Sequence, residues 1–460
     1  MDWSKSKLSR RKFIRLASGA VVGISAFGIM GCSKGSVEQM TSSQNSSGET
    51  SSDYTPVFPR HEAYGKGIGA KPGRVAWTHD ANSVKWDGSG YWWDLSHFDE
   101  PAILQMTQKG IATLAGVTTA KEGWDILFKA HNDLRGKQGG YSEGQKIAIK
   151  ANINGAAEFD DDYSGRSHHS YTNPVALKAL LISLVQDGNV KPENITVFDV
   201  TRIFPDYMQQ LCQDGVTKGV NFVSRINGVA DMNAPIVWTA HESDVINYLP
   251  TCVTEADYLI NLATLKGHDY GITLCAKNHF GSFINDYRLR APQQAQLHGN
   301  VSRQKMGDYS VLTDLMGNYQ LGEKTMLYMF DALICPSGNT VDITAENSTW
   351  EQAPFNNSFT ASLFFSQDPV AIDSVGADFL MNEPTVINNN SALKNNPDVE
   401  NYLHEAALID NAPSGTTYYN GNGTIIKNLG VHEHWNNPQD KKYSRNFGKA
   451  EGIELIYVDV

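Results

Sequence analysis

Cysteine is scarce in this 460-residue chain, which has five of them at wide spacing. No two form a CxxC or CxxxC pair, so we expect neither an iron–sulfur cluster nor a cysteine-rich zinc site. Four of the cysteines lie in apolar surroundings that favour buried thiols, although one or two disulfides stay open in an oxidising compartment. These four are Cys212, Cys252, Cys275 and Cys335.

Several nucleotide-binding and catalytic motifs are also missing. The chain has no GxxxxGK[ST] motif and no GxGxxG after a strand, and no GxSxG joins a predicted strand to a predicted helix. These absences argue against a P-loop NTPase, a nicotinamide-binding Rossmann enzyme and a serine hydrolase of the common type. No HExxH zinc motif and no internal repeat are present.

Positive charge is sparse outside the N-terminus. Residues 1–31 carry six Lys or Arg and one Asp, a net of +5, whereas the whole chain has a net charge of −12. The remainder therefore has a net charge of about −17. Phosphate backbones repel such an acidic body, so we do not expect a nucleic-acid partner.

The N-terminus reads as an export signal. Ser9-Arg10-Arg11-Lys12-Phe13-Ile14 resembles a twin-arginine signal, and the uncharged stretch 16–31 suits a signal peptide better than a membrane span. Ile29-Met30-Gly31-Cys32 resembles a lipoprotein cleavage box, which makes Cys32 the predicted lipidated residue. The alternatives are an uncleaved anchor and cleavage without lipid.

These features predict three segments and a location. We expect a twin-arginine and lipoprotein signal in 1–31, a flexible Ser/Gly-rich tether in 32–55 and one α/β domain in 56–460. The twin-arginine machinery would carry the protein across the cytoplasmic membrane. Lipid on Cys32 would then hold it in the cell envelope, on the periplasmic side or the cell surface.

Apolar runs of strand length alternate with helical patterns through the middle of the chain. Strands are predicted at 147–151 and 195–200, with a helix opened by Asn173-Pro174 between them. A strand–helix–strand unit with so short a crossover implies parallel strands. The predicted fold class is therefore α/β, with a mostly parallel sheet flanked by helices and with irregular N- and C-terminal extensions.

The stretch 254–283 carries the clearest sign of a site. An apolar run at 256–263 suits a strand buried on both faces, and polar residues and glycines follow it at once. Because ligands bind beyond the carboxyl ends of strands in α/β sheets, we expect a site there. The polar residues are Lys266, His268, Thr273, Lys277, Asn278 and His279.

Four segments of this chain resemble one protein family. They are 150–154 (KANIN), 172–184, 256–281 and 366–380, in the family's order. By these segments the chain is identified as a member of the domain of unknown function 362 family, in its twin-arginine-exported branch, with a family-like core at about 145–385. Ala151 replaces the proline that the family usually has in the first segment. Some relatives append a ferredoxin-like domain with clustered cysteines; no such cysteine cluster occurs in this sequence, so we do not expect an electron-transfer role.

The candidate site favours an anionic ligand. Lysines with Asn and His donors near glycines could hold a carboxylate or phosphate, with Lys266 and Lys277 supplying the charge. His268 or His279 would transfer a proton or bind a metal. The predicted catalytic group is Lys266, His268, Lys277 and His279, and the predicted ligand-binding group is Lys150, Asn152, Asn154, Thr273 and Asn278. The alternative is that the lysines pair with neighbouring acids.

A divalent metal is a second possibility at the same place. Imidazole with carboxylate suits zinc, iron or nickel, and carboxylates alone suit magnesium or calcium. The candidate ligands are His168, His268, His279, Asp199 and Asp331, and the run Asp160–Asp162 adds further carboxylates.

Two further groups need an interpretation. Asp368 before Pro369 is predicted to cap a helix, and Asp373 within that helix needs a cation or donors, for which Lys150, Lys266 or Lys277 could serve. His432 and His434 would share one face of a strand, and we interpret them as a surface pair.

The sequence thus leaves two functional hypotheses open. One is an enzyme or cofactor-binding protein whose site lies where the strand ends meet. The other is a non-catalytic envelope lipoprotein that binds a solute or a protein partner. The sequence does not decide whether the chain is an enzyme.

Overall fold

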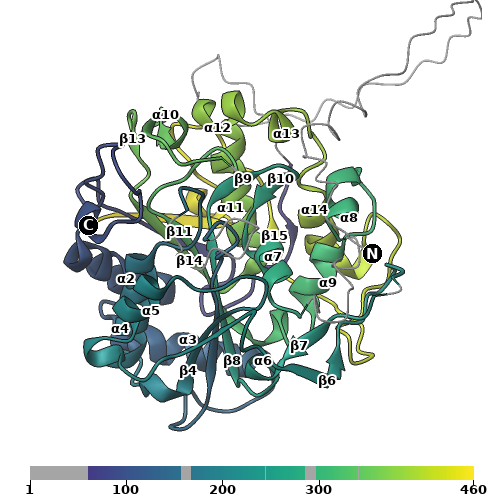
Figure 1. Cartoon of the computed structure of the whole chain (residues 1–460). Coiled ribbons are helices and arrows are strands. Elements are labelled where there is room, and N and C mark those ends of the chain that lie inside the picture. The colour runs from purple at the N-terminus through teal and green to yellow at the C-terminus, as the bar shows by residue number, and fades with distance from the viewer. Residues whose placement is uncertain (1–57, 59–60, 157–166, 244, 285–296, 340) are drawn as a thin grey trace, which may run out of the picture. The chain divides into compact units, whose positions relative to one another are not determined.

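Eight strands form the central sheet of the computed structural model (Figure 1). The structure describes residue 58 and residues 61–156, 167–243, 245–284, 297–339 and 341–460. The predicted export signal, the tether, Cys32 and Asp160–Asp162 therefore lie outside the described residues. Among the residues described, no helix combines the length and the apolar character needed to cross a membrane.

Seven of the eight strands run in one direction. Only β14 is antiparallel to its two neighbours, β11 and β2, and every other neighbouring pair is parallel. This confirms the predicted mostly parallel α/β sheet. The order across the sheet is β16 (Glu454–Asp459), β2 (Arg74–His79), β14 (Ser362–Ser366), β11 (Thr325–Ala332), β8 (Tyr258–Thr264), β3 (Ile147–Lys150), β4 (Ile195–Asp199) and β5 (Asn221–Ser224).

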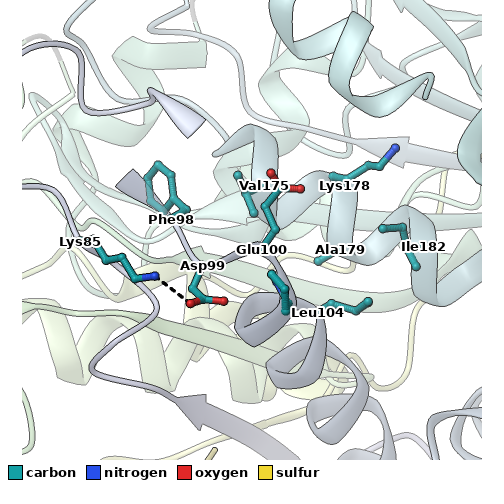
Figure 2. Close-up of a pocket in the computed structure, with 10 residues that line it drawn as sticks. Lys85, Phe98, Asp99, Glu100, Leu104, Val175, Lys178, Ala179 and Ile182 are labelled. Carbon is teal, nitrogen blue, oxygen red and sulfur yellow. Dashed lines mark hydrogen bonds and ion pairs between the residues drawn. The ribbon is translucent and has the colours of Figure 1, made fainter. Parts of the chain in front are cut away.

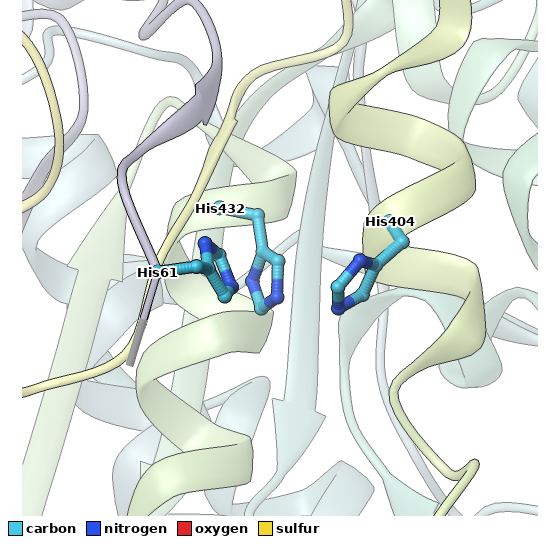
Figure 3. A group of neighbouring side chains, drawn as sticks. All are labelled: His61, His404 and His432. Atoms are coloured by element: carbon cyan, nitrogen blue, oxygen red, sulfur yellow. The ribbon is translucent and has the colours of Figure 1, made fainter. Parts of the chain in front are cut away.

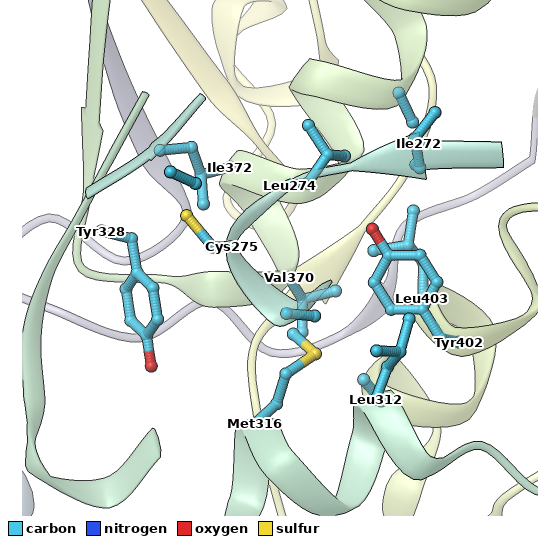
Figure 4. Packing of buried hydrophobic residues seen from close by; sticks show 14 of the residues in the cluster. Ile272, Leu274, Cys275, Leu312, Met316, Tyr328, Val370, Ile372, Tyr402 and Leu403 are labelled. Atoms are coloured by element: carbon cyan, nitrogen blue, oxygen red, sulfur yellow. The ribbon is translucent and has the colours of Figure 1, made fainter. Parts of the chain in front are cut away.

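Helices cover both faces of the sheet, because successive side chains of a strand point to opposite faces. Ile147 and Ile149 of β3 pack in one hydrophobic core and Ala148 packs in the other. The first core is covered by α2 (Glu100–Ala115), α3 (Ala120–Leu134), α4 (Pro174–Gln186) and α5 (Asp206–Cys212). The second is covered by α7 (Cys275–Asn278), α9 (Val311–Gly317), α11 (Pro369–Asn382) and α14 (Asn401–Ala407), whose packing Figure 4 shows.

Local sequence signals set the helix starts. The Asn173 side chain accepts hydrogen bonds from Val175 N and Ala176 N and so caps α4, with Pro174 as the first helical residue. Asp368 caps α11 in the same way and confirms the predicted cap. Asp368 also accepts hydrogen bonds from Ile68 N and Val431 N, so it holds the start of α11 to the loop after β1 and to strand β15.

Shorter elements complete the described chain. Two small two-stranded sheets matter for the sites: the β9–β10 hairpin follows β8, and β1 pairs with the distant β15. The short strands are β1 (Tyr64–Gly65), β6 (Ala230–Pro235), β7 (Tyr248–Pro250), β9 (Lys266–His268), β10 (Gly271–Thr273), β12 (Thr349–Trp350), β13 (Ser358–Phe359) and β15 (Val431–His432). The short helices are α6 (Thr251–Thr254), α8 (Leu297–Arg303), α10 (Ala345–Ser348), α12 (Pro384–Asn389) and α13 (Ser391–Lys394).

Candidate functional site

The carboxyl ends of the parallel strands meet at one edge of the sheet. Lys150 ends β3, Asp199 ends β4, and Asp331 is the next-to-last residue of β11. The β9–β10 hairpin and α7 follow β8 at the same edge. The topology thus brings the strand-end residues that were predicted from distant segments into one region.

A cavity of about 70 Å³, which we call the strand-end pocket, lies in this region. Eight of the predicted site residues line it. The strand ends contribute Lys150, Asn152, Asn154 and Asp199, and the segment after β8 contributes His268, Thr273, Lys277 and Asn278. The structure adds Thr201, His298 and Asn339, which the sequence did not single out.

Lys150 and Asp199 form a buried ion pair at the floor of the strand-end pocket. Lys150 Nζ lies 2.9 Å from Asp199 Oδ2 and also donates to Asn278 Oδ1 at 3.2 Å. Asp199 Oδ1 accepts hydrogen bonds from the backbone and the hydroxyl of Thr201. Burial lowers the pKa of Lys150, and Asp199 opposes that effect. Both charges are compensated within the chain, so this pair supports the site and is not available to a ligand.

Lys277 is different, because it lines the strand-end pocket without a carboxylate partner among the described residues. Its Nζ lies 3.2 Å from His298 Nε2 and 4.3 Å from the centre of the Phe280 ring. Burial lowers the pKa of Lys277 to about 7, and Asp269 acts in the opposite direction. The buried hydroxyl of Thr273, which lines the same pocket, also has no hydrogen-bond partner among the described residues.

Lys266 lies beside the strand-end pocket and does not line it. Its Nζ donates to Ser170 O at 2.9 Å, and burial together with Lys277 lowers the pKa of Lys266 to about 7.

Burial raises the pKa of nearby Asp331 to about 6, although Asp331 accepts hydrogen bonds from Asn173 N and Leu333 N. Three buried polar atoms around this pair lack partners among the described residues: Ser170 Oγ, Thr264 Oγ1 and Asn173 Nδ2.

The predicted histidines differ in their surroundings. His279 is fully buried, with Asn261 against Nε2 and Ser282 against Nδ1, and burial lowers its pKa to about 3. His268 lines the strand-end pocket, and its Nδ1 accepts a hydrogen bond from Tyr270 N. His168 does not line the pocket; it stacks on Tyr91. The structure therefore does not bring His168, His268 and His279 together as metal ligands.

Asp373 is stabilised by hydrogen-bond donors and not by a lysine. Its carboxylate accepts hydrogen bonds from Cys275 N, Ala276 N and the hydroxyl of Tyr402. The suggested lysine partners are wrong, because the start of α7 packs on α11 and presents backbone N–H groups to Asp373. Asp373 thus holds α7, with Lys277 on it, against α11.

The interpretation of His432 and His434 as a surface pair is also wrong. Both side chains are buried, and their ring centres are 4.9 Å apart, which agrees with the shared face that their spacing predicts. They belong to a group that we call the histidine cluster, which Figure 3 shows in part. Its members are His61, Glu400, His404, His432 and His434, and their ligand atoms form two sets of three within 4.8 Å of one another.

Both sets of three share His432, and neither includes a residue predicted as a metal ligand. A buried His/Glu group within metal-binding distance therefore exists in the described part of the chain. The sequence signal for it was the alternating triplet His432-Glu433-His434. Glu433 points elsewhere, since it binds Ser444 and Ile453 N.

A larger groove of about 660 Å³ lies between α2 and α4 (Figure 2). Its lining combines apolar side chains, such as Leu104, Val175 and Ile182, with four charged residues, and two of these, Lys85 and Asp99, form an ion pair at 2.8 Å. Lys178 donates to Leu211 O and to Thr217 Oγ1. Lys85, Asp99 and Lys178 are therefore engaged within the chain, whereas the exposed carboxylate of Glu100, which also lines the groove, forms no ion pair among the described residues.

The four cysteines in the described residues are all free thiols. Cys212, Cys275 and Cys335 are buried and Cys252 is partly buried. Burial raises the pKa of Cys212 and Cys252 to about 12, so these thiols are poor nucleophiles at neutral pH.

The segment Gly140-Tyr141-Ser142-Glu143-Gly144 matches GxSxG by letter. It precedes β3 and does not follow a strand, so it has none of the strand–turn–helix context of a hydrolase nucleophile.

The fold and the strand-end pocket together define an α/β protein with a polar, lysine-containing site at the carboxyl edge of its sheet. The model of the family described as "Domain of unknown function (DUF362)" matches residues 147–378, which is half of the chain, and the chain belongs to that family. The matched part runs from the start of β3 into α11 and so contains the strand-end pocket. No curated protein matches the chain.

Proposed function

We propose that this chain is an exported, lipid-anchored member of the family that binds a small anionic molecule in the strand-end pocket. The observation that carries the binding proposal is the state of Lys277. It is a buried lysine that faces a polar cavity and has no carboxylate within ion-pair distance among the described residues. A buried ammonium group without a counter-charge is costly, and a bound anion would supply that counter-charge.

The donors around Lys277 suit a carboxylate or a phosphate. Thr273 has a hydroxyl without a partner among the described residues in the same cavity, and Asn152 and Asn154 also line that cavity. A cavity of about 70 Å³ is large enough for one such group and not for a whole drug-sized molecule. The pocket would therefore hold the charged end of a ligand.

A metal ion fits this pocket less well than an anion. Lys277 and Lys266 both lie close to it, and each would repel a cation. Asp199, the nearest predicted carboxylate ligand, already pairs with Lys150.

The remaining predicted residues take supporting roles in this proposal. Lys266 lies near Lys277 and adds positive charge to the region, and the Lys150–Asp199 ion pair holds part of the pocket lining in place. Of the two predicted histidines, His268 is the one positioned for proton transfer, since it lines the pocket, whereas both ring nitrogens of His279 are engaged. Whether a reaction follows binding depends on the ligand.

Binding is tested by titrating inorganic phosphate, sulfate and succinate into the purified protein and measuring heat and thermal stability. We expect at least one of these probes to bind the native chain and to bind Lys277→Gln at least tenfold more weakly. Lys324→Gln is the matched control, because Lys324 is also buried but donates to Val253 O and Thr254 O at the opposite edge of the sheet. Equal binding by the native chain and Lys277→Gln would contradict the proposal, and so would failure of all three probes.

Export and anchoring are tested separately in cells with a twin-arginine system. Replacing Arg10 and Arg11 by Lys should keep the protein in the cytoplasm. Cys32→Ala should still be exported but should move from the membrane fraction to the soluble fraction. Export of the double variant, or membrane attachment of Cys32→Ala, would contradict this part of the proposal.

A further inference from the structure

We propose that the histidine cluster binds one divalent transition-metal ion through His61, Glu400, His404, His432 and His434. This site is separate from the strand-end pocket: the cluster residues do not line that pocket, and they lie outside the segment that matches the family model. The proposal depends on side-chain geometry and not on the proposed anion binding.

Three distant segments bring the five side chains together. His61 lies just before β1, and β1 pairs with β15 so that Tyr64 is opposite His432. Glu400 and His404 are four residues apart at the start of α14, on one face of the helix. The rings of His61, His404 and His432 have centres 4.8 to 5.5 Å apart and lie side by side (Figure 3).

One potential ligand atom of each residue is buried and has no hydrogen-bond partner among the described residues. These atoms are the Nε2 atoms of His61, His404, His432 and His434 and the Oε2 atom of Glu400. Two of the five, His434 Nε2 and Glu400 Oε2, lie 2.8 Å apart as an ion pair, which leaves the Nε2 atoms of His61, His404 and His432 without a hydrogen-bond partner among the described residues. Buried polar atoms are nearly always hydrogen-bonded, so three unpaired nitrogens in one cluster need an explanation. A metal ion bound at the cluster would satisfy these three nitrogens and also bind Glu400 and His434.

The opposite nitrogens of three rings are already held. His434 Nδ1 lies 2.8 Å from Asp378 Oδ1, and His61 Nδ1 lies 2.7 Å from Glu62 O. His432 Nδ1 lies 2.8 Å from Ser374 Oγ, whose own proton goes to Val370 O. Each of these acceptors fixes a proton on Nδ1 and leaves the lone pair on Nε2, which is the arrangement of metal-bound histidines.

The ligand atoms form two sets of three that share His432, each set within 4.8 Å, and no set within that distance contains all five, so binding one ion through all five would draw the two sets together. Metal–ligand bonds of about 2.1 Å place ligand atoms about 3 to 4 Å apart. Two distances fall in this range, 3.7 Å from Glu400 Oε2 to His432 Nε2 and 3.6 Å from Glu400 Oε1 to His404 Nε2, and the 2.8 Å between Glu400 Oε2 and His434 Nε2 is shorter. Asp378 and Glu400 are both buried, and a divalent ion would balance two such carboxylates.

An ion pair without metal accounts for only part of this arrangement. A protonated His434 between Asp378 and Glu400 would satisfy those three side chains. It would leave the Nε2 atoms of His61, His404 and His432 buried and unpaired. The metal explains all five atoms, and therefore we prefer it.

The donor set indicates the class of metal. Imidazole-rich sites suit iron, nickel, copper, cobalt and zinc, whereas calcium and magnesium prefer oxygen ligands. Five ligands exceed the four of a structural zinc site and leave one position of an octahedron for water or another small ligand.

The test uses the untagged full chain, stripped with a chelator and then dialysed separately against Co²⁺, Ni²⁺, Zn²⁺ and Fe²⁺. Elemental analysis should give one ion per chain for at least one of these metals. His404→Gln and His432→Gln should bind that metal at least 100-fold more weakly. His131→Gln should bind it like the native chain, because His131 is a buried histidine with an unpartnered Nε2 that lies on α3, outside the cluster.

Folding is checked by comparing the metal-free variants with the metal-free native chain in thermal unfolding. His404 is partly exposed, so His404→Gln should fold even if His432→Gln does not. Failure of all four metals to bind the folded native chain would overturn the proposal. Binding that survives in His404→Gln would also overturn it.

Discussion

The strand-end pocket and the histidine cluster are both buried polar groups, but they differ in the sign of the charge they lack. In the strand-end pocket, Lys277 is a cation with no carboxylate partner among the residues that the structure describes. In the histidine cluster, two buried carboxylates, Asp378 and Glu400, share His434, and the Nε2 atoms of three further histidines have no hydrogen-bond partner in the described part of the chain, so this region lacks positive charge. Because burial makes an uncompensated group costly, each region indicates the kind of ligand that would complete it.

The largest expected effect is a difference in stability between two lysine variants of the strand-end pocket, one at Lys150, which is ion-paired, and one at Lys277, which is proposed to bind the ligand. Lys150→Met leaves Asp199 buried without its partner and should lower the free energy of unfolding by about 3 to 5 kcal/mol. Lys277→Met leaves no carboxylate without its partner among the described residues and should change that free energy by less than about 1 kcal/mol. Urea denaturation measures both values, and a similar loss in the two variants would contradict the distinction.

The next effect tests the missing cation of the histidine cluster. A metal present at 100 times its dissociation constant should stabilise the native chain by about 2.7 kcal/mol, because it binds the folded state. Glu400→Gln, which removes the ligand charge, should show much less of this gain. Thermal unfolding with and without metal measures it, and full stabilisation of Glu400→Gln would show that the ion binds elsewhere.

A smaller effect concerns Ser374, which orients His432, one of the proposed metal-binding residues. Ser374→Ala removes the acceptor at His432 Nδ1 and leaves all five proposed ligands in place. Metal affinity should fall by about 10- to 100-fold, as for other groups that orient metal-bound histidines. Competition with a chelator of known affinity measures the change. The account would be weakened if Ser374→Ala bound metal as tightly as the native chain.

The smallest effect is the pH dependence of anion binding. Burial lowers the pKa of Lys277 to about 7, so the ammonium form dominates below pH 7 and the neutral amine dominates above it. Since only the ammonium form attracts an anion, affinity should be full below pH 7 and should fall about tenfold per pH unit above it. Phosphate itself changes charge near neutral pH, so sulfate is the probe for this titration. Affinity that is constant from pH 6 to pH 9 would contradict this role of Lys277.

The sequence predicted the fold and the strand-end pocket for the same physical reason. Apolar runs such as 256–263 identify buried strands, and parallel strands place their carboxyl ends at one edge whatever their order in the sheet. Lys150, Asp199 and Lys277 could therefore be assigned to one region before their contacts were known. The Lys150–Asp199 pair and the donors around Asp373 could not be assigned, because they depend on how α7 packs on α11 and the sheet.

The histidine cluster could not be predicted from local pattern. His61 and His432 meet only because β1 pairs with β15, across most of the length of the chain. Glu400 and His404 come from α14, where a lone Glu and His four residues apart are typical of an exposed helix face. The triplet 432–434 correctly indicated that two imidazoles share a face, but burial of that face is a property of the tertiary fold.

The central claim is that the two regions bind ligands of opposite charge independently. The most direct test is a Co²⁺ titration, followed by absorption spectroscopy, of the native chain, Lys277→Gln and His432→Gln, each also titrated with sulfate. We predict that His432→Gln loses Co²⁺ binding and keeps sulfate binding, and that Lys277→Gln shows the reverse. Loss of both ligands in one folded variant, or loss of neither in both, would contradict the claim.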